Sequence, residues 1–173
     1  KYLVDRGYWV RGVDTKMPEY EPSAAQAFEL LDLRRWDNCL IATRGIDTVY
    51  GLAADMGGIG YITGYLADIS RNNTLIDTHM LEASRVNGVS RFFYSSSACV
   101  YPGYRQDRPD IAPLKEEGAY PADPEEGYGW EKLYTEKLCE YYTHDYGLET
   151  RVARFHNVYG PLGTYDGGRE KAP

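Results

Sequence analysis

The sequence predicts an α/β domain built around a doubly wound parallel sheet. Short apolar stretches of strand type alternate along the chain with stretches whose apolar residues recur at helical spacing. Two helical stretches, residues 66–86 and 124–146, are long enough to carry the chain from one end of a strand back to the other. Because such connections are right-handed crossovers between parallel strands, the alternation indicates the fold class.

The first half of the chain contributes three strands and one short helix to this pattern. Residues 1–7 are typical of a helix end that stops at Gly7, because glycine readily adopts the left-handed conformation that closes a helix. The first apolar stretch ends in Asp14 and the second in Asp32. The expected strands are residues 8–13, 28–31 and 48–54, with a helix near residues 36–43.

The second half contributes both long helices and two more strands. The first long helix has apolar residues at positions 66, 69, 76 and 80 and is expected to stop at Gly88, and the second is expected to stop at Gly147. Strands are expected at residues 91–95 and 150–155. Residues 101–123 contain several prolines and glycines and predict a long functional loop, since structureless connections of that length are otherwise uncommon.

Composition narrows the class of protein. A chain of 173 residues with 43% hydrophobic content is sufficient for one domain with a sizeable core. The net charge of -7 argues against a nucleic-acid partner, and no stretch approaches the roughly 18 apolar residues of a membrane span. Residues 1–12 lack the features of a secretory signal, so we expect a cytoplasmic protein.

The cysteines suggest neither a disulfide framework nor a metal site. Cys39, Cys99 and Cys139 are odd in number and show no Cys-x-x-Cys spacing. We therefore expect reduced thiols and no zinc.

Tyr128 and Lys132, on the second long helix, form a pair that could take part in catalysis. A spacing of four residues places both side chains on one face, where the Lys132 ammonium can lower the pKa of the neighbouring phenol and help it to shuttle a proton. Many helices carry this spacing by chance, so the pair gains meaning only from its surroundings.

Polar or small residues follow the expected strands, where doubly wound sheets bind their ligands. Asp14 could accept hydrogen bonds from an adenosine ribose or could cap a turn, and Asp32 could face an adenine amine or begin a helix. Ala53 and Ala54 leave room for a cofactor. Asn73 lies on the apolar stripe of the first long helix, where its amide must be hydrogen-bonded to backbone or to a ligand, so it is a further cofactor candidate.

Two glycine-rich runs do not fit nucleotide-binding patterns. Gly57-Gly-Ile-Gly60 follows the third expected strand, but Thr63 stands where a dinucleotide fingerprint needs glycine. In residues 163–170, Arg169 and Glu170 replace the lysine and hydroxyl residue of a phosphate loop. Neither run supports a nucleoside triphosphatase.

Four segments together resemble the extended short-chain dehydrogenase/reductase family of nucleotide-sugar epimerases and dehydratases. They are Leu52-Ala-Ala-Asp55, Tyr94-Ser-Ser-Ser-Ala-Cys-Val-Tyr101, Tyr128 with Lys132, and Arg154-Phe-His-Asn-Val-Tyr-Gly-Pro161. Ala54-Asp-Met-Gly-Gly58 and Gly167-Gly-Arg-Glu-Lys-Ala-Pro173 narrow the resemblance to a branch that epimerises GDP-mannose at two ring carbons. The resemblance spans nearly the whole chain and implies a Rossmann-like fold.

The resemblance also implies a mechanism with NAD as the cofactor. Tyr128, assisted by Lys132 and Ser97, would take a proton while NAD accepts hydride from carbon 4 of the sugar. Cys99 and Lys171 would then act as the acid/base pair that inverts carbons 3 and 5. In related dehydratases the two residues after the catalytic hydroxyl are typically Asp-Glu, whereas this chain has Ala98 and Cys99, which argues against elimination of water.

Further contacts carry over from the family position by position. The positions that match cofactor contacts are Asp14, Asp32, Tyr128 and Lys132. The positions that match contacts with the nucleotide sugar are Gly57, Ser97, Ala98, Cys99, Asn157, Glu170, Lys171 and Ala172. The family resemblance also suggests a homodimer.

The chain departs from the family at both ends. The glycine turn that would hold the cofactor pyrophosphate should precede Lys1, and the C-terminal substrate domain should follow Pro173. We therefore interpret residues 1–173 as a partial cofactor-binding domain, with the substrate-binding region starting at about 160–173, and expect weak or no NAD binding by this polypeptide alone.

Two other functions remain open at this point. The chain could belong to another nucleotide-sugar 4-epimerase or reductase, which would need only Tyr128, Lys132 and a hydroxyl residue. It could also be a binding protein that keeps the fold without catalysis.

Overall fold

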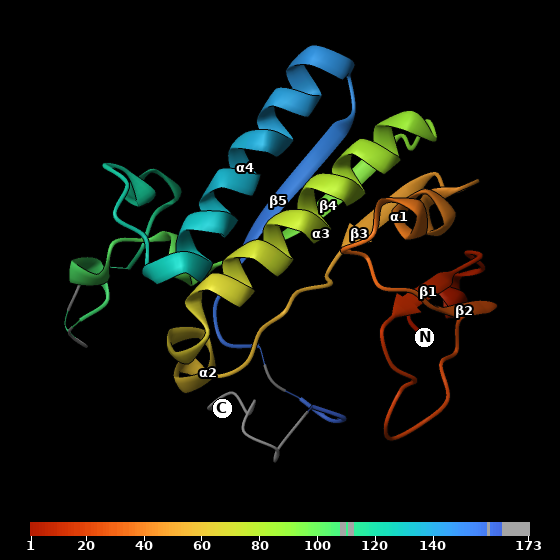
Figure 1. Ribbon diagram of the computed structural model, residues 1–173, viewed down its shortest axis with the longest axis horizontal. Coiled ribbons are helices and arrows are strands. Elements are labelled where there is room, and N and C mark those ends of the chain that lie inside the picture. Colours follow the sequence, from red (N-terminus) through yellow and green to blue (C-terminus); the bar gives the residue numbers. More distant parts are fainter. Residues whose placement is uncertain (108–109, 111–112, 159, 164–173) are drawn as a thin grey trace.

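The computed structural model describes residues 1–107, 110, 113–158 and 160–163, and Figure 1 shows the alternation of its strands and helices. The first half contains η1 (Val4–Arg6), β1 (Arg11–Asp14), β2 (Ala27–Leu30), α1 (Trp36–Thr43) and β3 (Thr48–Gly51). The second half contains α2 (Ile59–Gly64), α3 (Leu66–Val86), β4 (Arg91–Ser97), η2 (Ala98–Val100), η3 (Gly103–Arg105), η4 (Glu116–Ala119), α4 (Glu126–Tyr146) and β5 (Glu149–Phe155). Within these ranges, no helix combines the length and the apolar content needed to cross a membrane.

All five described strands pair in parallel, which confirms the α/β prediction. Strand β1 pairs with β2, and β4 lies between β3 and β5. The pairs belong to a two-stranded and a three-stranded sheet rather than to one continuous sheet. Crossover lengths specify the direction of a strand but not its hydrogen-bonding partner, so the sequence pattern could not reveal this division.

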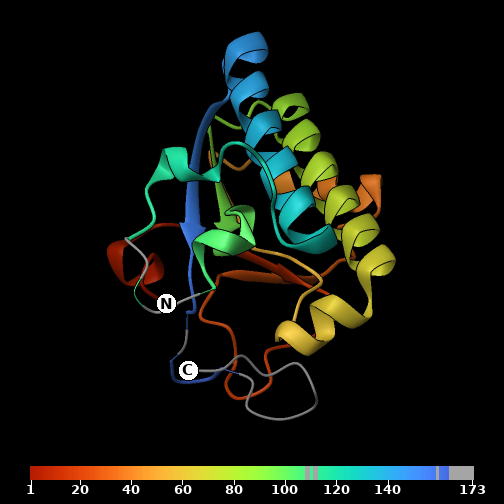
Figure 2. The same cartoon turned by 90° about the vertical axis from the view of Figure 1, so that its left-hand side faces the viewer.

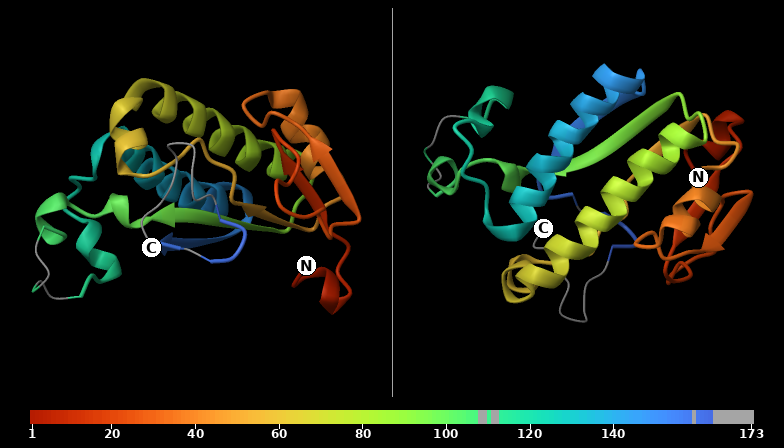
Figure 3. Two further views of the ribbon diagram at one scale, coloured as in Figure 1. Left: turned by 90° about the horizontal axis from the view of Figure 1, so that it is seen from below. Right: turned by 45° about the horizontal axis from the view of Figure 1, so that its top comes forward.

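Helices α3 and α4 lie side by side across one face of the three-stranded sheet (Figures 1 and 3). On that face Phe92 and Tyr94 are almost fully buried in the main core, because alternate residues of β4 point toward the helices. The opposite face carries a row of three aromatic rings from Tyr50, Phe93 and Phe155. Tyr50 and Phe155 are exposed, so the helices leave this face uncovered in the described part of the chain.

Helix boundaries agree well with the sequence pattern. Helices α1 and α3 begin and end at the predicted residues, and α4 starts two residues later than expected. Gly88 and Gly147 follow α3 and α4 with φ angles of 72° and 71°, the left-handed conformation that ends a helix.

Two elements near residue 60 differ from the prediction. Strand β3 ends at Gly51, because the Asn73 amide binds both backbone groups of Asp55 and holds that segment out of the sheet. The short helix α2 was not predicted, since two of its six residues are glycine. Ile62 explains why it forms: the side chain is buried against Ile69.

The loop over residues 101–123 is attached to the sheet by Arg154 of β5. The guanidinium makes a two-pronged ion pair with Glu136 and donates to the Tyr101 hydroxyl and to the Glu116 backbone oxygen. Figure 2 looks onto this loop, which lies at the end of the molecule where β4 ends and α4 begins.

Candidate active site

The first turns of α4 place Tyr128 and Lys132 on the face that is turned into the protein. Tyr128 is 5% exposed and Lys132 is 1% exposed. The Lys132 Nζ atom lies 5.6 Å from the centroid of the Tyr128 ring. The predicted pair therefore exists as a buried phenol with an ammonium group beside it.

Two glycines allow α4 to begin in this position. A Cβ atom at Gly127 would collide with Ser70 Oγ of α3, and one at Gly129 would collide with the Cys99 backbone oxygen. The segment Gly127-Tyr-Gly129 thus brings the helix start against α3 on one side and against the end of β4 on the other. Tyr128 is held between these two contacts.

Ser97 and Cys99 meet Tyr128 at the end of β4. The Ser97 hydroxyl accepts a hydrogen bond from the Cys99 N–H at 3.2 Å and caps the short helix η2. Cys99 packs against the cluster of Ile62, Ile69 and Tyr128. The structure therefore brings together four predicted catalytic residues, Ser97, Cys99, Tyr128 and Lys132.

Burial favours the protonated forms of the Tyr128 phenol and the Cys99 thiol in the resting site. Burial raises the pKa of the Tyr128 phenol, while the Lys132 charge and a hydrogen bond with Ser97 oppose that rise. Burial also raises the pKa of the Cys99 thiol, and the Glu125 carboxylate adds to this effect. Cys99 thus rests as a proton donor, whereas Tyr128 has two neighbours that support loss of its proton.

Three acidic residues near the site were missed by the sequence analysis. Asp77 of α3 and Glu131 of α4 lie within 4 Å of the Lys132 ammonium, at 3.8 Å and 3.9 Å. Glu125 precedes α4, its backbone N–H donates to the Cys99 backbone oxygen at 2.9 Å, and its carboxylate raises the pKa of the Cys99 thiol. Asp77 could have been noticed because it lies one helical turn after Asn73 on the same stripe; Glu125 carries no comparable signal.

The residues after β3 are placed by Asn73. Its Oδ1 accepts from the Asp55 N–H at 2.6 Å, and its Nδ2 donates to the Asp55 oxygen and to Glu131. The amide thereby ties the segment that carries Ala53, Ala54 and Gly57 to α3. The Asn73 amide itself is engaged by protein groups.

Asp14 and Asp32 differ in how their carboxylates are used. Asp14 is exposed and accepts from the backbone N–H groups of Thr15 and Lys16 through Oδ1. Asp32 receives a two-pronged ion pair from Arg34, which lowers the pKa of its carboxyl group. Asp14 therefore keeps one oxygen available toward solvent in the described structure, and Asp32 is occupied by its neighbour.

The remaining substrate candidates are only partly described. Ala98 lies in η2, and Asn157 is exposed two residues after the end of β5, the strand that pairs with β4. The predicted residues Glu170, Lys171 and Ala172 lie outside the described residues.

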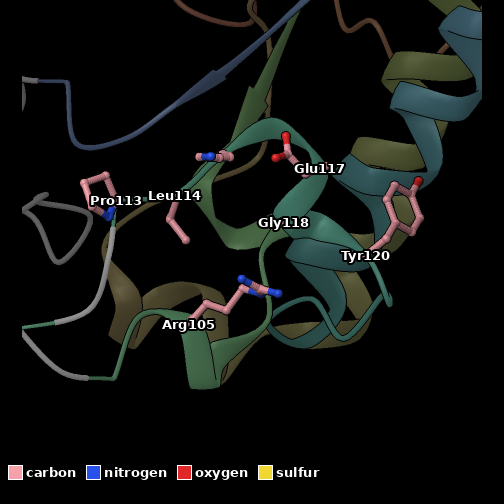
Figure 4. A pocket seen from close by; sticks show the side chains of 7 residues that line it. Arg105, Pro113, Leu114, Glu117, Gly118 and Tyr120 are labelled. Carbon is pink, nitrogen blue, oxygen red and sulfur yellow. The ribbon is translucent and has the colours of Figure 1, made fainter.

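A separate hollow lies in the loop that follows the site. Figure 4 shows this cavity of about 450 Å³, with Arg105 of η3 on one side and Leu114, Glu117 and Tyr120 on the other. Its described lining includes none of the predicted site residues. The cavity is therefore distinct from the Tyr128 site.

Comparison of the sequence with protein-family models identifies the class of protein. The chain belongs to the NAD dependent epimerase/dehydratase family, whose model matches residues 1–172. It is 53% identical to GDP-mannose 3,5-epimerase 1 of Oryza sativa subsp. japonica and 50% identical to GDP-mannose 3,5-epimerase of Arabidopsis thaliana. Both alignments cover 99% of this chain and 46% of the relative, so the chain spans about half the length of these proteins.

A solved structure supports the fold. UDP-glucose 4-epimerase of Thermus thermophilus in complex with NAD matches with a TM-score of 0.78 at 26% identity. The match covers 92% of this chain and 51% of that structure.

Proposed function

We propose that the protein containing this chain is an NAD-dependent GDP-mannose 3,5-epimerase. The observation that carries the proposal is the placement of the Cys99 thiol beside the Tyr128–Lys132 pair. A proton-shuttling phenol suits transient oxidation, and a nearby thiol suits proton exchange at the adjacent carbons. The names of the two plant relatives, at 50–53% identity, support the same substrate.

The residues present fit NAD in part. The solvent-facing oxygen of Asp14 suits a ribose hydroxyl, and the small side chains of Ala53 and Ala54 leave space beside the end of β3. Asp32 and Asn73 would have to exchange existing partners for cofactor contacts. When bound, NAD supplies the acceptor and later the donor of a hydride.

Each chain residue then has a defined task. Tyr128 receives the proton of the carbon-4 hydroxyl, and Lys132 stabilises the phenolate form that can receive it. Ser97 orients the same hydroxyl group. The ketone at carbon 4 acidifies carbons 3 and 5, where Cys99 and Lys171 act as the acid/base pair that removes and returns protons. We assign contacts with the nucleotide sugar to Gly57, Ala98 and Asn157, and also to Glu170 and Ala172.

Isotope exchange tests the proposal directly. The full-length protein, incubated with GDP-mannose in heavy water, is expected to place deuterium at carbons 3 and 5, as read by NMR. Absence of deuterium at both carbons would contradict the assignment.

Replacing Cys99 separates this function from a simple 4-epimerase or reductase. Cys99→Ala is expected to slow deuterium exchange by roughly 10²-fold or more, the usual contribution of a general acid or base, while hydride transfer to NAD continues. An unchanged exchange rate would favour a reaction that uses only Tyr128 and Lys132. A fold-retaining binding protein would show neither exchange nor hydride transfer.

We also propose a homodimer, in a cytoplasmic setting consistent with three free thiols. The exposed face of α4 carries Trp130, Tyr134 and Tyr141, each more than half exposed. Their spacing of four and seven residues forms a single aromatic stripe suited to burial against a second copy. In this proposal residues 1–173 are part of the cofactor-binding domain and the substrate-binding region starts near residue 160.

A further inference from the structure

A buried group of charged side chains lies behind Tyr128, between α3 and α4. Lys132 is 1% exposed, and Asp77 and Glu131 are each 5% exposed. The Lys132 Nζ atom lies 3.8 Å from Asp77 Oδ2 and 3.9 Å from Glu131 Oε1. Three ionisable groups in so little water are stable only when their charges and hydrogen bonds are matched.

Asp77 is held in a fixed orientation. The Tyr94 hydroxyl of β4 donates to Asp77 Oδ2 at 2.7 Å, and the Thr135 hydroxyl of α4 donates to the same oxygen at 3.3 Å. Two donors from two different elements therefore hold one carboxylate oxygen next to the ammonium.

Glu131 is placed to serve as a neutral partner. Its Oε1 accepts from the Asn73 amide at 3.0 Å, while its buried Oε2 accepts no hydrogen bond within the described ranges. Burial raises the pKa of the Glu131 carboxyl to about 8. At neutral pH the Glu131 carboxyl therefore keeps its proton, which leaves the Asp77 carboxylate to balance the Lys132 ammonium.

We propose that Asp77 is the counter-ion of Lys132 and a positioning residue for the Tyr128–Lys132 pair, with Glu131 as a neutral buried neighbour. Held by Asp77, the Lys132 ammonium lies 4.8 Å from the centroid of the Tyr94 ring and 5.6 Å from that of Tyr128. From this position its charge favours the phenolate of Tyr128. The inference deepens the proposed function and rests on it for its kinetic readout.

The direction of the pH effect follows from the groups that face Lys132. They are Asp77 from α3, Tyr94 from β4, and Tyr128, Glu131 and Cys139 from α4. Burial alone lowers the pKa of Lys132, but its interactions with Asp77, Glu131 and Tyr128 outweigh burial, with Asp77 contributing most among them, and hold that pKa above its usual value. Without the Asp77 charge, Lys132 loses its proton at lower pH, and Tyr128 loses the neighbour that favours its phenolate.

The test uses the full-length protein with Asp77→Asn. The titration of Lys132 is followed by NMR of ¹³Cε-labelled lysine, with the signal assigned by Lys132→Arg. We expect a lower titration midpoint in the variant and an alkaline limb of kcat shifted to lower pH. Turnover should fall roughly tenfold to hundredfold with little change in KM, since general acid–base catalysis contributes about 10²–10⁴-fold.

Asp68→Asn is the matched control, because Asp68 lies on the same helix but pairs with Arg71 at the surface. The Asp68→Asn variant is expected to have the same Lys132 titration midpoint and the same pH dependence of kcat as the unmodified protein. If Asp77→Asn folds and shows the same midpoint and profile as the unmodified protein, the proposal is overturned.

Glu131→Gln keeps the proposal testable if Asp77→Asn does not fold. Glutamine mimics the neutral carboxyl, so the titration midpoint of Lys132 should stay above the ordinary lysine value. Titration of Glu131 should produce an inflection near pH 8 in the chemical shift of the Lys132 NMR signal, and this inflection should disappear in the variant. A midpoint below the ordinary value would make Glu131 the counter-ion and would overturn the assignment to Asp77. These titrations do not require turnover, so failure to epimerise GDP-mannose would remove the proposed function and leave the counter-ion test intact.

Discussion

The Cys99 thiol lies in an environment that differs clearly from those of the other two cysteines. Cys39 and Cys139 are fully buried, and burial raises the pKa of each thiol to about 12. Cys99 is only partly buried, and its raised pKa depends on burial together with the Glu125 carboxylate. Among the three thiols, all of which lie in the described structure, only that of Cys99 is partly accessible, and its pKa is raised by burial together with a neighbouring carboxylate.

Glu125→Gln is expected to speed alkylation of Cys99 by iodoacetamide several-fold near pH 8. Removing the negative neighbour lowers the pKa of the thiol, so more thiolate is present at that pH. The measurement is the pH dependence of labelling, read by mass spectrometry of the peptide that contains Cys99. Glu126→Gln, an exposed change one residue away, should leave the labelling rate alone; equal acceleration in both variants would contradict the role of Glu125.

The start of helix α4 depends on close contacts that leave no room for a side chain. Gly129 would place a Cβ atom against the Cys99 backbone oxygen and 3.0 Å from Pro124 Cβ. Alanine is the better helix former by about 1 kcal/mol, but here the backbone contact outweighs that preference.

Gly129→Ala is expected to destabilise the protein by about 1–3 kcal/mol, the usual cost of overpacking a rigid site. Chemical denaturation monitored by circular dichroism measures the change. Gly60→Ala in α2 is the matched control, because no atom lies within 4 Å of a Cβ at that position. The control should be neutral or stabilise by up to about 1 kcal/mol; equal destabilisation of both variants would show that the close contact is not the cause.

The same elements show what the sequence could and could not predict. Apolar repeats and terminal glycines identified α1, α3 and α4, because local spacing controls where a helix begins and ends. Helix α2 was missed because it depends on the packing of Ile62 against distant residues. At the site, Tyr128 and Lys132 could be recognised from their spacing, whereas Asp77 comes from another helix and only the tertiary fold brings it to Lys132.

The aromatic stripe of α4 predicts that the protein associates with a second copy of itself. Trp130, Tyr134 and Tyr141 are exposed, at spacings of four and seven residues, on a helix that covers the sheet with its other face. A second copy that packs on this stripe would remove it from water.

Tyr134→Glu in the full-length protein is expected to convert the dimer to a monomer, because a charge would be buried at the interface. Sedimentation velocity measures the change. Tyr104→Glu serves as the control, since Tyr104 is similarly exposed, at 54%, but lies on η3, away from the stripe. A monomeric unmodified protein, or a Tyr134→Glu variant that remains dimeric, would contradict the proposal.

The attachment of the 101–123 loop by Arg154 has a consequence for the order of folding. The guanidinium contacts Tyr101, Glu116 and Glu136, which precede it by 53, 38 and 18 residues. During synthesis all three partners leave the ribosome before Arg154 does, and contacts over such separations form only after the entropy of loop closure has been overcome. The loop next to Cys99 therefore becomes fixed only after β5 has been added to the sheet, so the surroundings of the proposed catalytic thiol are completed late in folding.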